Sequence, residues 1–429
     1  MKNTAFKYGK STKSVSIAID NWLDTIESSL PENSNLSEEE IILNALKYPI
    51  GSQPLKDKVL PGEKVCIVIS DITRSWQRMQ VYLRYIVDEL EKGGVKDEDI
   101  TFLCATGSHR KQTKEEHRIL IGEKLFHRFE VIDHDCHDSD NHVYMGTTSF
   151  GTPVKINKVA VSCDHLIITG AVIFHDLAGW GGGKKSILPG ISAYESIMAN
   201  HALSLSPSIG KGTHPMVKSG NIIHNPLHED MVEAVNLVKP SFLFNVIINE
   251  QGRIGGAVAG HYLKAHEAGR KMVDEIDGVF IKEKADLVIV SAGGYPKDIN
   301  LYQASKAISN AKEALKDKGT MILVAECSEG IGDSEMQEII DNFNNNTDRE
   351  IFLRENFSVT RYIAYLMAEL AEKFDIILVS DMSPGTLSNI GIKIVSTVEE
   401  ALDYSYIKKG KHLATYLMPN GSNTLPKLV

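Results

Sequence analysis

The feature that most restricts the fold of this chain is a regular alternation between short β-branched runs and longer segments with helical periodicity. The short runs have the length and composition of buried strands, and amphipathic segments stand between them. This pattern is typical of α/β proteins, because parallel strands are joined by crossover connections that are usually helices. The predicted strands are Val65–Ser70, Ile100–Cys104, Phe129–Ile132, His165–Thr169, Phe242–Ile248, Leu287–Ser291, Met321–Ala325 and Ile376–Ser380. The predicted helices are Val81–Lys92, Glu195–Leu203, Glu229–Val238, Tyr302–Lys316 and Thr360–Lys373.

The length of 429 residues exceeds that of one ordinary hydrophobic core and predicts more than one domain. A boundary is expected between residues 265 and 285, where a helical segment leads into the apolar run ADLVIVSAGG. We therefore predict two α/β domains, at residues 1–275 and 276–429, with mainly parallel sheets and a cleft between them.

Charge and cysteine usage exclude several classes of partner. The chain has 46 basic and 56 acidic residues and a net charge of −10, whereas binding to nucleic acid needs a positive field. Its five cysteines are scattered and form no CxxC motif, which indicates reduced thiols rather than a disulfide framework. No signal-peptide pattern and no run of about 20 apolar residues is present. We expect a soluble cytoplasmic protein with no nucleic-acid or membrane partner.

The most informative segment is HDLAGWGGGKKSILPGIS, which runs from His175 to Ser192 behind a predicted strand. It has four glycines within five positions, and two lysines follow them directly. Glycines let a backbone approach a ligand closely and present N–H groups to it, so Gly182 and Gly183 are candidate cofactor contacts. A lysine in a desolvated loop can lose its proton and act as a nucleophile or attachment point, which makes Lys185 a candidate.

A Walker A loop and a plain structural turn both explain this segment less well than a loop that binds a ligand. A Walker A motif requires glycine where Lys184 stands, and no convincing Walker B strand follows. A purely structural turn would explain the glycines but not the adjacent lysines. A loop that binds phosphate or a cofactor is therefore the preferred interpretation.

Polar side chains also follow several of the predicted strands or flank the loop, where ligands collect in open α/β sheets. Taken singly, each histidine among them is more often a hydrogen-bonded structural residue. The argument for a site rests on their joint occurrence. These residues are Asp71, Thr73 and Arg74 in SDITR, His109 in ATGSHR, His175 and His201 around the loop, and Tyr302, Gln303 and Lys306 in LYQASK.

In order and spacing, these segments resemble the nickel-dependent lactate racemase family. The resemblance covers nearly the whole chain and includes DxTR, ATGxHR, a glycine loop with KxILPG, an NH pair and YQxxK. It implies a racemase or epimerase that inverts C2 of a small 2-hydroxy acid. It also implies a nickel-pincer nucleotide (pyridinium-3,5-bisthiocarboxylic acid mononucleotide nickel), built by cofactor-synthesis proteins and held by the first domain while the second closes over the substrate.

The resemblance implies a role for each matched residue. Lys185 would carry the cofactor covalently, and His201 would be the protein's nickel ligand, completing a square-planar site. His109 and His175 would be the acid/base pair. Arg74 and Lys306 would hold the substrate carboxylate, with Tyr302 and Gln303 nearby. Asp71 and Thr73 would contact the cofactor.

This chemistry accounts for the residue types. Removing hydride from C2 gives a stable 2-keto acid, whereas removing a proton would place a carbanion beside a carboxylate. Each enantiomer needs its own base for the hydroxyl proton, hence two histidines. A carrier or sensor that binds the cofactor without turnover is the alternative, although it would need neither the histidine pair nor the carboxylate clamp. An NAD-dependent dehydrogenase is weaker still, because no GxGxxG follows the first predicted strand.

The sequence departs from the family pattern in the loop. Asp176 replaces an aromatic residue, Lys184 replaces arginine, and Trp180 stands where tyrosine or phenylalanine is common. An acidic side chain near the substrate would bind additional hydroxyl groups and repel a second carboxylate. This favours a larger or polyhydroxylated 2-hydroxy acid over malate.

The run HDCHDSDNH (134–142) resembles a metal site, but a solvated turn is the preferred interpretation because one short loop rarely completes a coordination sphere.

Overall fold

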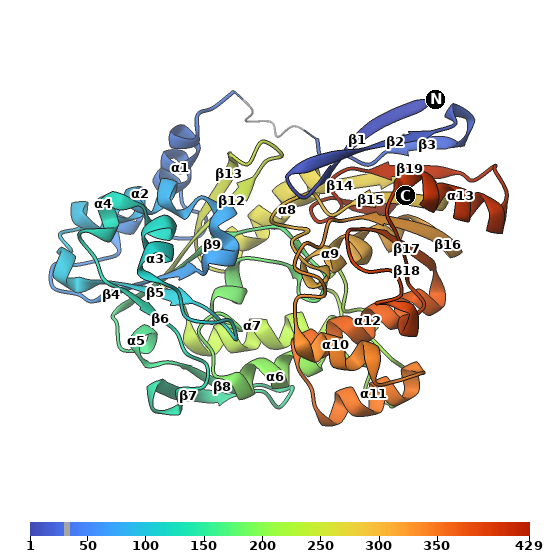
Figure 1. Cartoon of the computed structure of the whole chain (residues 1–429). Coiled ribbons are helices and arrows are strands. Elements are labelled where there is room, and N and C mark those ends of the chain that lie inside the picture. Colours follow the sequence, from blue (N-terminus) through green and yellow to red (C-terminus); the bar gives the residue numbers. More distant parts are fainter. Residues whose placement is uncertain (30–34) are drawn as a thin grey trace.

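The protein is built on two six-stranded sheets that lie on opposite sides of the molecule (Figure 1). The computed structural model describes residues 1–29 and 35–429. The first sheet has the order β13-β12-β9-β4-β5-β6 and is parallel except for β13, and the second has the order β18-β17-β16-β15-β19-β3 and is parallel throughout. The first sheet consists of β4 (Val65–Ser70), β5 (Ile100–Ala105), β6 (Val131–Asp133), β9 (His165–Ala171), β12 (Phe242–Ile248) and β13 (Ile254–Gly260). The second consists of β3 (Trp22–Thr25), β15 (Ala285–Ser291), β16 (Leu315–Val324), β17 (Asp375–Val379), β18 (Lys393–Val395) and β19 (Thr415–Met418).

Helices cover the sheets because each has an apolar face. In α2, the fully buried positions Met79, Leu83, Ile86 and Leu90 recur every three or four residues and join the same apolar core as strands of the first sheet. The helices are α1 (Glu38–Lys47), α2 (Met79–Lys92), α3 (Lys114–Ile121), α4 (Glu123–Phe126), α5 (Lys158–Val161), α6 (Tyr194–Ala202), α7 (Pro226–Val238), α8 (Lys264–Asp277), α9 (Leu301–Ala311), α10 (Ser334–Asp341), α11 (Asn346–Glu355), α12 (Val359–Lys373) and α13 (Val398–Lys409). Pairs of short strands complete the fold: β1 (Lys2–Tyr8) with β2 (Ser11–Ile17), β7 (His142–Thr147) with β8 (Pro153–Asn157), β10 (Phe174–His175) with β11 (Gly179–Trp180), and β14 (Gly278–Ile281) with β20 (Leu425–Leu428).

The predicted fold class is confirmed: the chain is an α/β protein with mainly parallel sheets. Every predicted strand overlaps an observed one, and Val65–Ser70 and Phe242–Ile248 match β4 and β12 at both ends. The helix predicted over Tyr302–Lys316 is wrong at its end. It stops at Ala311, and after a short 3-10 turn the chain enters β16 at Leu315, where pairing with β15 outweighs helical periodicity. Within the described residues, no helix has the length and apolarity needed to cross a membrane.

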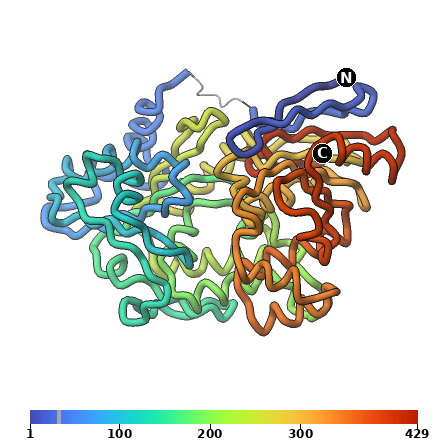
Figure 2. The backbone as a smooth tube through the Cα atoms, in the orientation of Figure 1, coloured from blue at the N-terminus to red at the C-terminus, as the bar shows by residue number. Residues whose placement is uncertain are grey.

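The first 25 residues pack against the second sheet, far from their neighbours in sequence. The β1–β2 hairpin contributes Phe6 and Val15 to the same apolar cluster as Leu287 in β15 and Leu417 in β19. Strand β3 then pairs in parallel with β19 at the sheet edge. Figure 2 shows this hairpin in blue beside the red C-terminal segment. The division at residues 275 and 276 stays a prediction. Strand β3 from the first 25 residues lies in the same sheet as β19 from the last 15 residues.

A loop that follows α6 runs from the first half of the chain to the helices of the second. Thr213 Oγ1 donates a hydrogen bond of 2.5 Å to Glu369 in α12, and the Arg354 guanidinium in α11 donates one of 2.7 Å to the Ser206 carbonyl. These contacts hold the two halves together beside the loop of glycines and lysines.

The contribution of the N-terminal hairpin to stability can be measured with one buried phenylalanine. Phe6 is fully buried, so Phe6→Ala should lower the free energy of unfolding by about 3–5 kcal/mol, through lost burial and the resulting cavity. Phe280→Ala is the matched control, because that ring is 72% exposed, and it should change the value by less than about 0.5 kcal/mol. Urea unfolding monitored by tryptophan fluorescence gives both values. Equal effects of the two substitutions would contradict the packing described here.

Candidate active site

The glycine loop is fastened tightly to the first sheet. Gly182 and Gly183 have positive φ values of 73° and 54°, and a Cβ on Gly182 would lie 2.7 Å from the Ala171 carbonyl oxygen. The Gly183 N–H donates to Asn245 Oδ1 in β12 at 2.8 Å, and the Gly181 N–H donates to the Ile173 carbonyl at 2.8 Å. These two N–H groups therefore bind the protein itself. A cofactor role for Gly182 and Gly183 stays a prediction, and the structure shows that they let the loop pack closely on β9 and β12.

Lys185 lies beside a histidine in a desolvated position. Its Nζ is 2.9 Å from His175 Nε2. Burial, together with the nearby Arg74, lowers the pKa of Lys185 to about 8, although Asp176 opposes this shift. At pH 7 roughly one tenth of the amine is therefore in the unprotonated form that a nucleophile requires, far more than for an ordinary lysine.

His175 is held from its other ring nitrogen by Asp176. Its Nδ1 lies 3.0 Å from Asp176 Oδ1, and the Asp176 side chain is only 8% exposed. Burial would raise the pKa of Asp176, but His175 and Lys306 hold it below its usual range. Burial and the charge of Lys185 lower the pKa of His175 to about 4. The Leu177 and Ala178 N–H groups also donate to Nδ1, at 3.2 and 3.3 Å, so this nitrogen faces both a carboxylate and two backbone donors. The lowered pKa keeps the ring neutral, and Nε2 is the nitrogen that faces Lys185.

His109 has a similar arrangement at the ends of two neighbouring strands. It follows β5, and its Nδ1 lies 2.5 Å from Oδ2 of Asp71, the residue that follows β4. Asp71 is buried and also accepts a hydrogen bond of 2.6 Å from Thr73 Oγ1, which in turn accepts one of 2.8 Å from Arg74. Although burial opposes ionisation, His109 helps to keep the pKa of Asp71 lowered. Asp71 and Thr73, predicted as cofactor contacts, here position His109 and Arg74.

His201 lies in the last turn of α6 and is 4% exposed. Its Nδ1 is 2.9 Å from the Ile197 carbonyl, which fixes the proton on that nitrogen. Burial and the charge of Lys185 lower the pKa of His201 to about 3. The ring is therefore neutral, and its Nε2 keeps a lone pair that can bind a metal ion.

The second half of the chain contributes the start of α9. Asn300 caps this helix by accepting a 3.0 Å hydrogen bond from the Gln303 N–H, and Lys306 Nζ donates to Gln303 Oε1 at 2.7 Å. Burial and the positive charge of Arg74 lower the pKa of Lys306 to about 7, against the effect of Asp176. Burial raises the pKa of Tyr302 to about 12. Asp176 lines one cavity together with Ser309 of α9, so residues of the two halves of the chain face one another.

Several features of this region were not anticipated. Asn245, which anchors the loop, is 62 positions from its partner Gly183, so no local pattern identifies it. Lys184 is 3% exposed, and burial lowers its pKa well below the usual value. In the run 134–142 the solvated-turn interpretation is wrong for His134, which is buried and bonded to the Ser192 carbonyl at 2.9 Å. Among the described residues, no group of three or more His, Cys, Asp or Glu side chains is arranged to hold a metal ion.

Comparison with known proteins identifies the family. The family model for the lactate racemase N-terminal domain matches residues 8–212, and that for the lactate racemase C-terminal domain matches residues 280–425. The chain belongs to the lactate racemase family. It is 32% identical to the lactate racemase of Lactiplantibacillus plantarum over 98% of both chains. It is 36% identical to the lactate racemase of Thermoanaerobacterium thermosaccharolyticum over 77% of this chain and 76% of that protein. Membership establishes a racemase, which is an isomerase.

Solved structures agree with this assignment. The lactate racemase apoprotein of Thermoanaerobacterium thermosaccharolyticum superposes with a TM-score of 0.91 and 31% identity, covering 99% of this chain and 100% of that one. A Thermotoga maritima protein shares the fold at a TM-score of 0.68 and 18% identity, covering 94% of this chain and 100% of that one. The lactate racemase architecture therefore extends over nearly the whole length of the chain.

The lowered pKa of Lys185 predicts selective acylation. With cofactor-free protein, labelling of Lys185 by acetic anhydride should reach half its maximal rate near pH 8, because the free amine is the reactive form. Lys92 is the internal control, since its pair with Glu89 raises its pKa, and it should react far more slowly at that pH. Asp176→Asn should move the Lys185 midpoint to lower pH, because the carboxylate favours the protonated amine. Peptide mass spectrometry gives the rates, and equal pH profiles for the two lysines would refute the assignment.

Proposed function

We propose that this racemase inverts C2 of a small 2-hydroxy acid, either lactate or a larger hydroxy acid, by removal and return of hydride through a 2-keto acid. The observation that carries the proposal is a pair of histidines, each in contact with a largely buried carboxylate. The contacts are 2.5 Å between His109 and Asp71 and 3.0 Å between His175 and Asp176. Two bases are what inversion needs, because the hydroxyl group of each enantiomer must lose its proton on a different side.

The residues present fit a lysine-tethered nickel-pincer nucleotide. Lys185 supplies an amine with a lowered pKa for the covalent link, and His201 supplies one neutral imidazole nitrogen. This nitrogen would add to the donors that the cofactor itself brings, and imidazole suits nickel. When bound, this group would supply an electrophilic carbon able to accept and return a hydride. Cofactor-synthesis proteins would build and load it. The five free cysteines fit the reducing cytoplasm, where we place the enzyme.

The chain's own residues would bind, orient and exchange a proton with the substrate. Arg74 and Lys306 would hold the carboxylate from opposite sides of the cleft, with Tyr302 and Gln303 beside them. The Nε2 atom of His109 or His175 would accept the hydroxyl proton of one enantiomer, and the imidazolium that forms would be stabilised by Asp71 or Asp176. The other histidine would donate a proton to the substrate oxygen when the inverted hydroxy acid forms. The two histidines would therefore exchange roles between the two directions.

One substitution separates this proposal from a carrier or sensor that only binds the cofactor. His109→Ala should lower kcat for a turned-over 2-hydroxy acid by about 10²–10⁴-fold, since proton transfer is lost, while bound nickel stays unchanged. His127→Ala is the matched control, because that exposed ring pairs only with Glu123 at the surface and should leave both values unaltered. Chiral chromatography and metal analysis give the two readings. A loaded wild-type protein that inverts no 2-hydroxy acid would favour the carrier.

The fate of the C2 hydrogen tests the hydride route. In light water, a substrate carrying deuterium at C2 should give an inverted product that retains the deuterium, because hydride is held out of contact with solvent. Proton abstraction by a histidine would instead exchange the label for hydrogen. Mass spectrometry of each enantiomer after partial conversion distinguishes the two routes, and loss of the label in step with inversion would disprove hydride transfer.

A further inference from the structure

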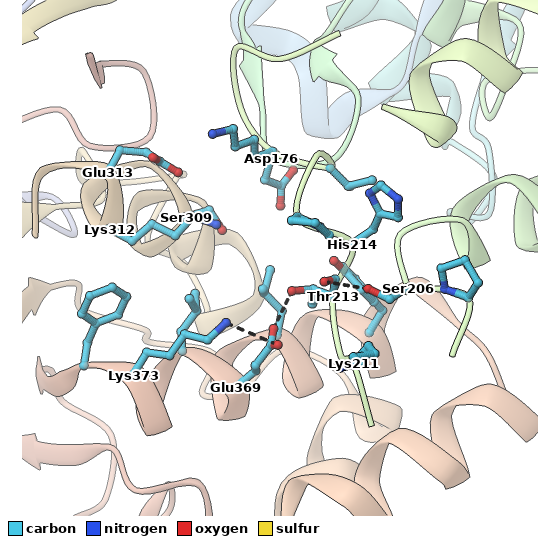
Figure 3. A pocket seen from close by; sticks show the side chains of 18 of the residues that line it. Asp176, Ser206, Lys211, Thr213, His214, Ser309, Lys312, Glu313, Glu369 and Lys373 are labelled. Atoms are coloured by element: carbon cyan, nitrogen blue, oxygen red, sulfur yellow. Dashed lines mark hydrogen bonds and ion pairs between the residues drawn. The ribbon is translucent and has the colours of Figure 1, made fainter. Parts of the chain in front are cut away.

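A cavity of about 580 Å³ opens next to Asp176, in the cleft between the first half of the chain and helices α9 and α12. This volume falls within the range of about 300–1,000 Å³ typical of small-molecule sites. Figure 3 shows Asp176 reaching the cavity from the glycine loop, Ser309 from α9, Lys312 from the turn after α9, and Glu369 and Lys373 from α12. Because Asp176 also contacts His175, the cavity begins where the proposed reaction centre ends.

The wall nearest the reaction centre suits a ligand that donates hydrogen bonds. The Asp176 carboxylate is ionised, and its Oδ1 lies 3.0 Å from His175 Nδ1. A carboxylate can accept up to about four hydrogen bonds, so acceptor capacity remains on the cavity side. The buried Ser309 lies across from it and adds a hydroxyl group. Hydroxyl groups on the carbons that follow C2 would satisfy both.

The end of the cavity that Lys312 lines provides a cation, and the lining as a whole is positively charged. The lining includes five lysines against three carboxylates, and one of those carboxylates, Glu369, is already paired with Lys373 at 3.4 Å and Thr213 at 2.5 Å. Lys312 lies half-buried at this end, where burial lowers its pKa despite the adjacent Glu313. Burial destabilises the protonated form of the Lys312 amine, and a negatively charged ligand group beside it would stabilise that form.

Helix α9 relates this end to the proposed carboxylate clamp. Lys306 and Ser309 are three residues apart and so lie on one side of α9, and Lys312 begins the turn that follows the helix. With a rise of about 1.5 Å per residue, Lys306 and Lys312 are about 9 Å apart along the axis. The helix and its turn thus bring Ser309 and Lys312 to the cavity that Asp176 also lines.

We propose that this cavity binds the tail of the substrate, which bears hydroxyl groups near C2 and an anionic group, a carboxylate or a phosphate, at its far end. The inference rests on the proposed function, since C2 must lie between His109 and His175. It extends that function by naming the substrate class: a hydroxylated acid with anionic groups at both ends. Asp176 repels a second anion close to C2, and Lys312 attracts one at a distance.

Binding to the cofactor-free full-length chain tests the proposal without turnover. Calorimetry at neutral pH would compare lactate, gluconate, glucarate and 6-phosphogluconate. Gluconate should bind about tenfold more tightly than lactate, and glucarate or 6-phosphogluconate about tenfold more tightly than gluconate. The tighter of these last two identifies the terminal group as carboxylate or phosphate. Equal affinity for lactate and gluconate would overturn the tail site, and no gain from either terminal anion would overturn the anionic end.

Substitutions locate the effect within the cavity. Lys312→Gln should abolish the gain from the terminal anion, and Lys312→Arg should restore it. The matched control is Lys316→Gln, because Lys316 is exposed and pairs with Asp286 at 2.9 Å outside the cavity. Unchanged thermal unfolding would show that the Lys312→Gln protein is folded. An undiminished gain in folded Lys312→Gln would contradict the assignment.

Turnover by the cofactor-loaded enzyme separates this inference from the proposed function. The ratio of kcat/KM for a diacid to that for lactate should exceed about tenfold and fall to near one in Lys312→Gln. If the binding order holds but no 2-hydroxy acid is inverted, the proposed function fails while the cavity assignment stands. If lactate is inverted and the ratio is near one, the function stands and the tail site is wrong.

Discussion

A lysine amine that is desolvated near another cation loses its proton far more readily than one in water, and this site depends on that effect at Lys185. Its amine lies 2.9 Å from His175 Nε2, and burial brings its pKa to about 8. The glycine loop makes this placement possible. Positive φ at Gly182 and Gly183 and the hydrogen bond to Asn245 press the chain onto β9 and β12, where a bulkier residue would not fit.

Several positive charges surround the Lys185 amine, and two carboxylates lie where they offset them. Arg74 and Lys306 approach from the two halves of the chain, and each positive charge disfavours the others. Asp71 and Asp176 are the buried counter-charges, and each also contacts one histidine. The same two residues therefore offset the charge of the site and orient its bases. A site prepared in this way needs little rearrangement when an anionic substrate enters, because its cations are already fixed.

Local patterns in the sequence predicted much of the fold but few of its long-range contacts. Periodicity located β4 and β12 to the residue, because buried parallel strands are uniformly apolar. It could not show that β3 pairs with β19, since that contact joins residues about 390 positions apart and depends on packing of the hairpin around Phe6. The candidate residues were found because polar motifs follow strand ends. Asn245 was missed because it lies inside an apolar strand, and the pairing of Asp71 with His109 depends on β4 and β5 being neighbours.

The central claim is that Lys185 and His201 together hold a nickel-pincer cofactor. Intact-protein mass spectrometry combined with metal analysis tests it most directly, on protein co-expressed with the cofactor-synthesis machinery. The account predicts a covalent adduct that maps to Lys185, with about one nickel per chain that is lost in His201→Ala. An unmodified chain without nickel, obtained while the machinery demonstrably makes the cofactor, would contradict it.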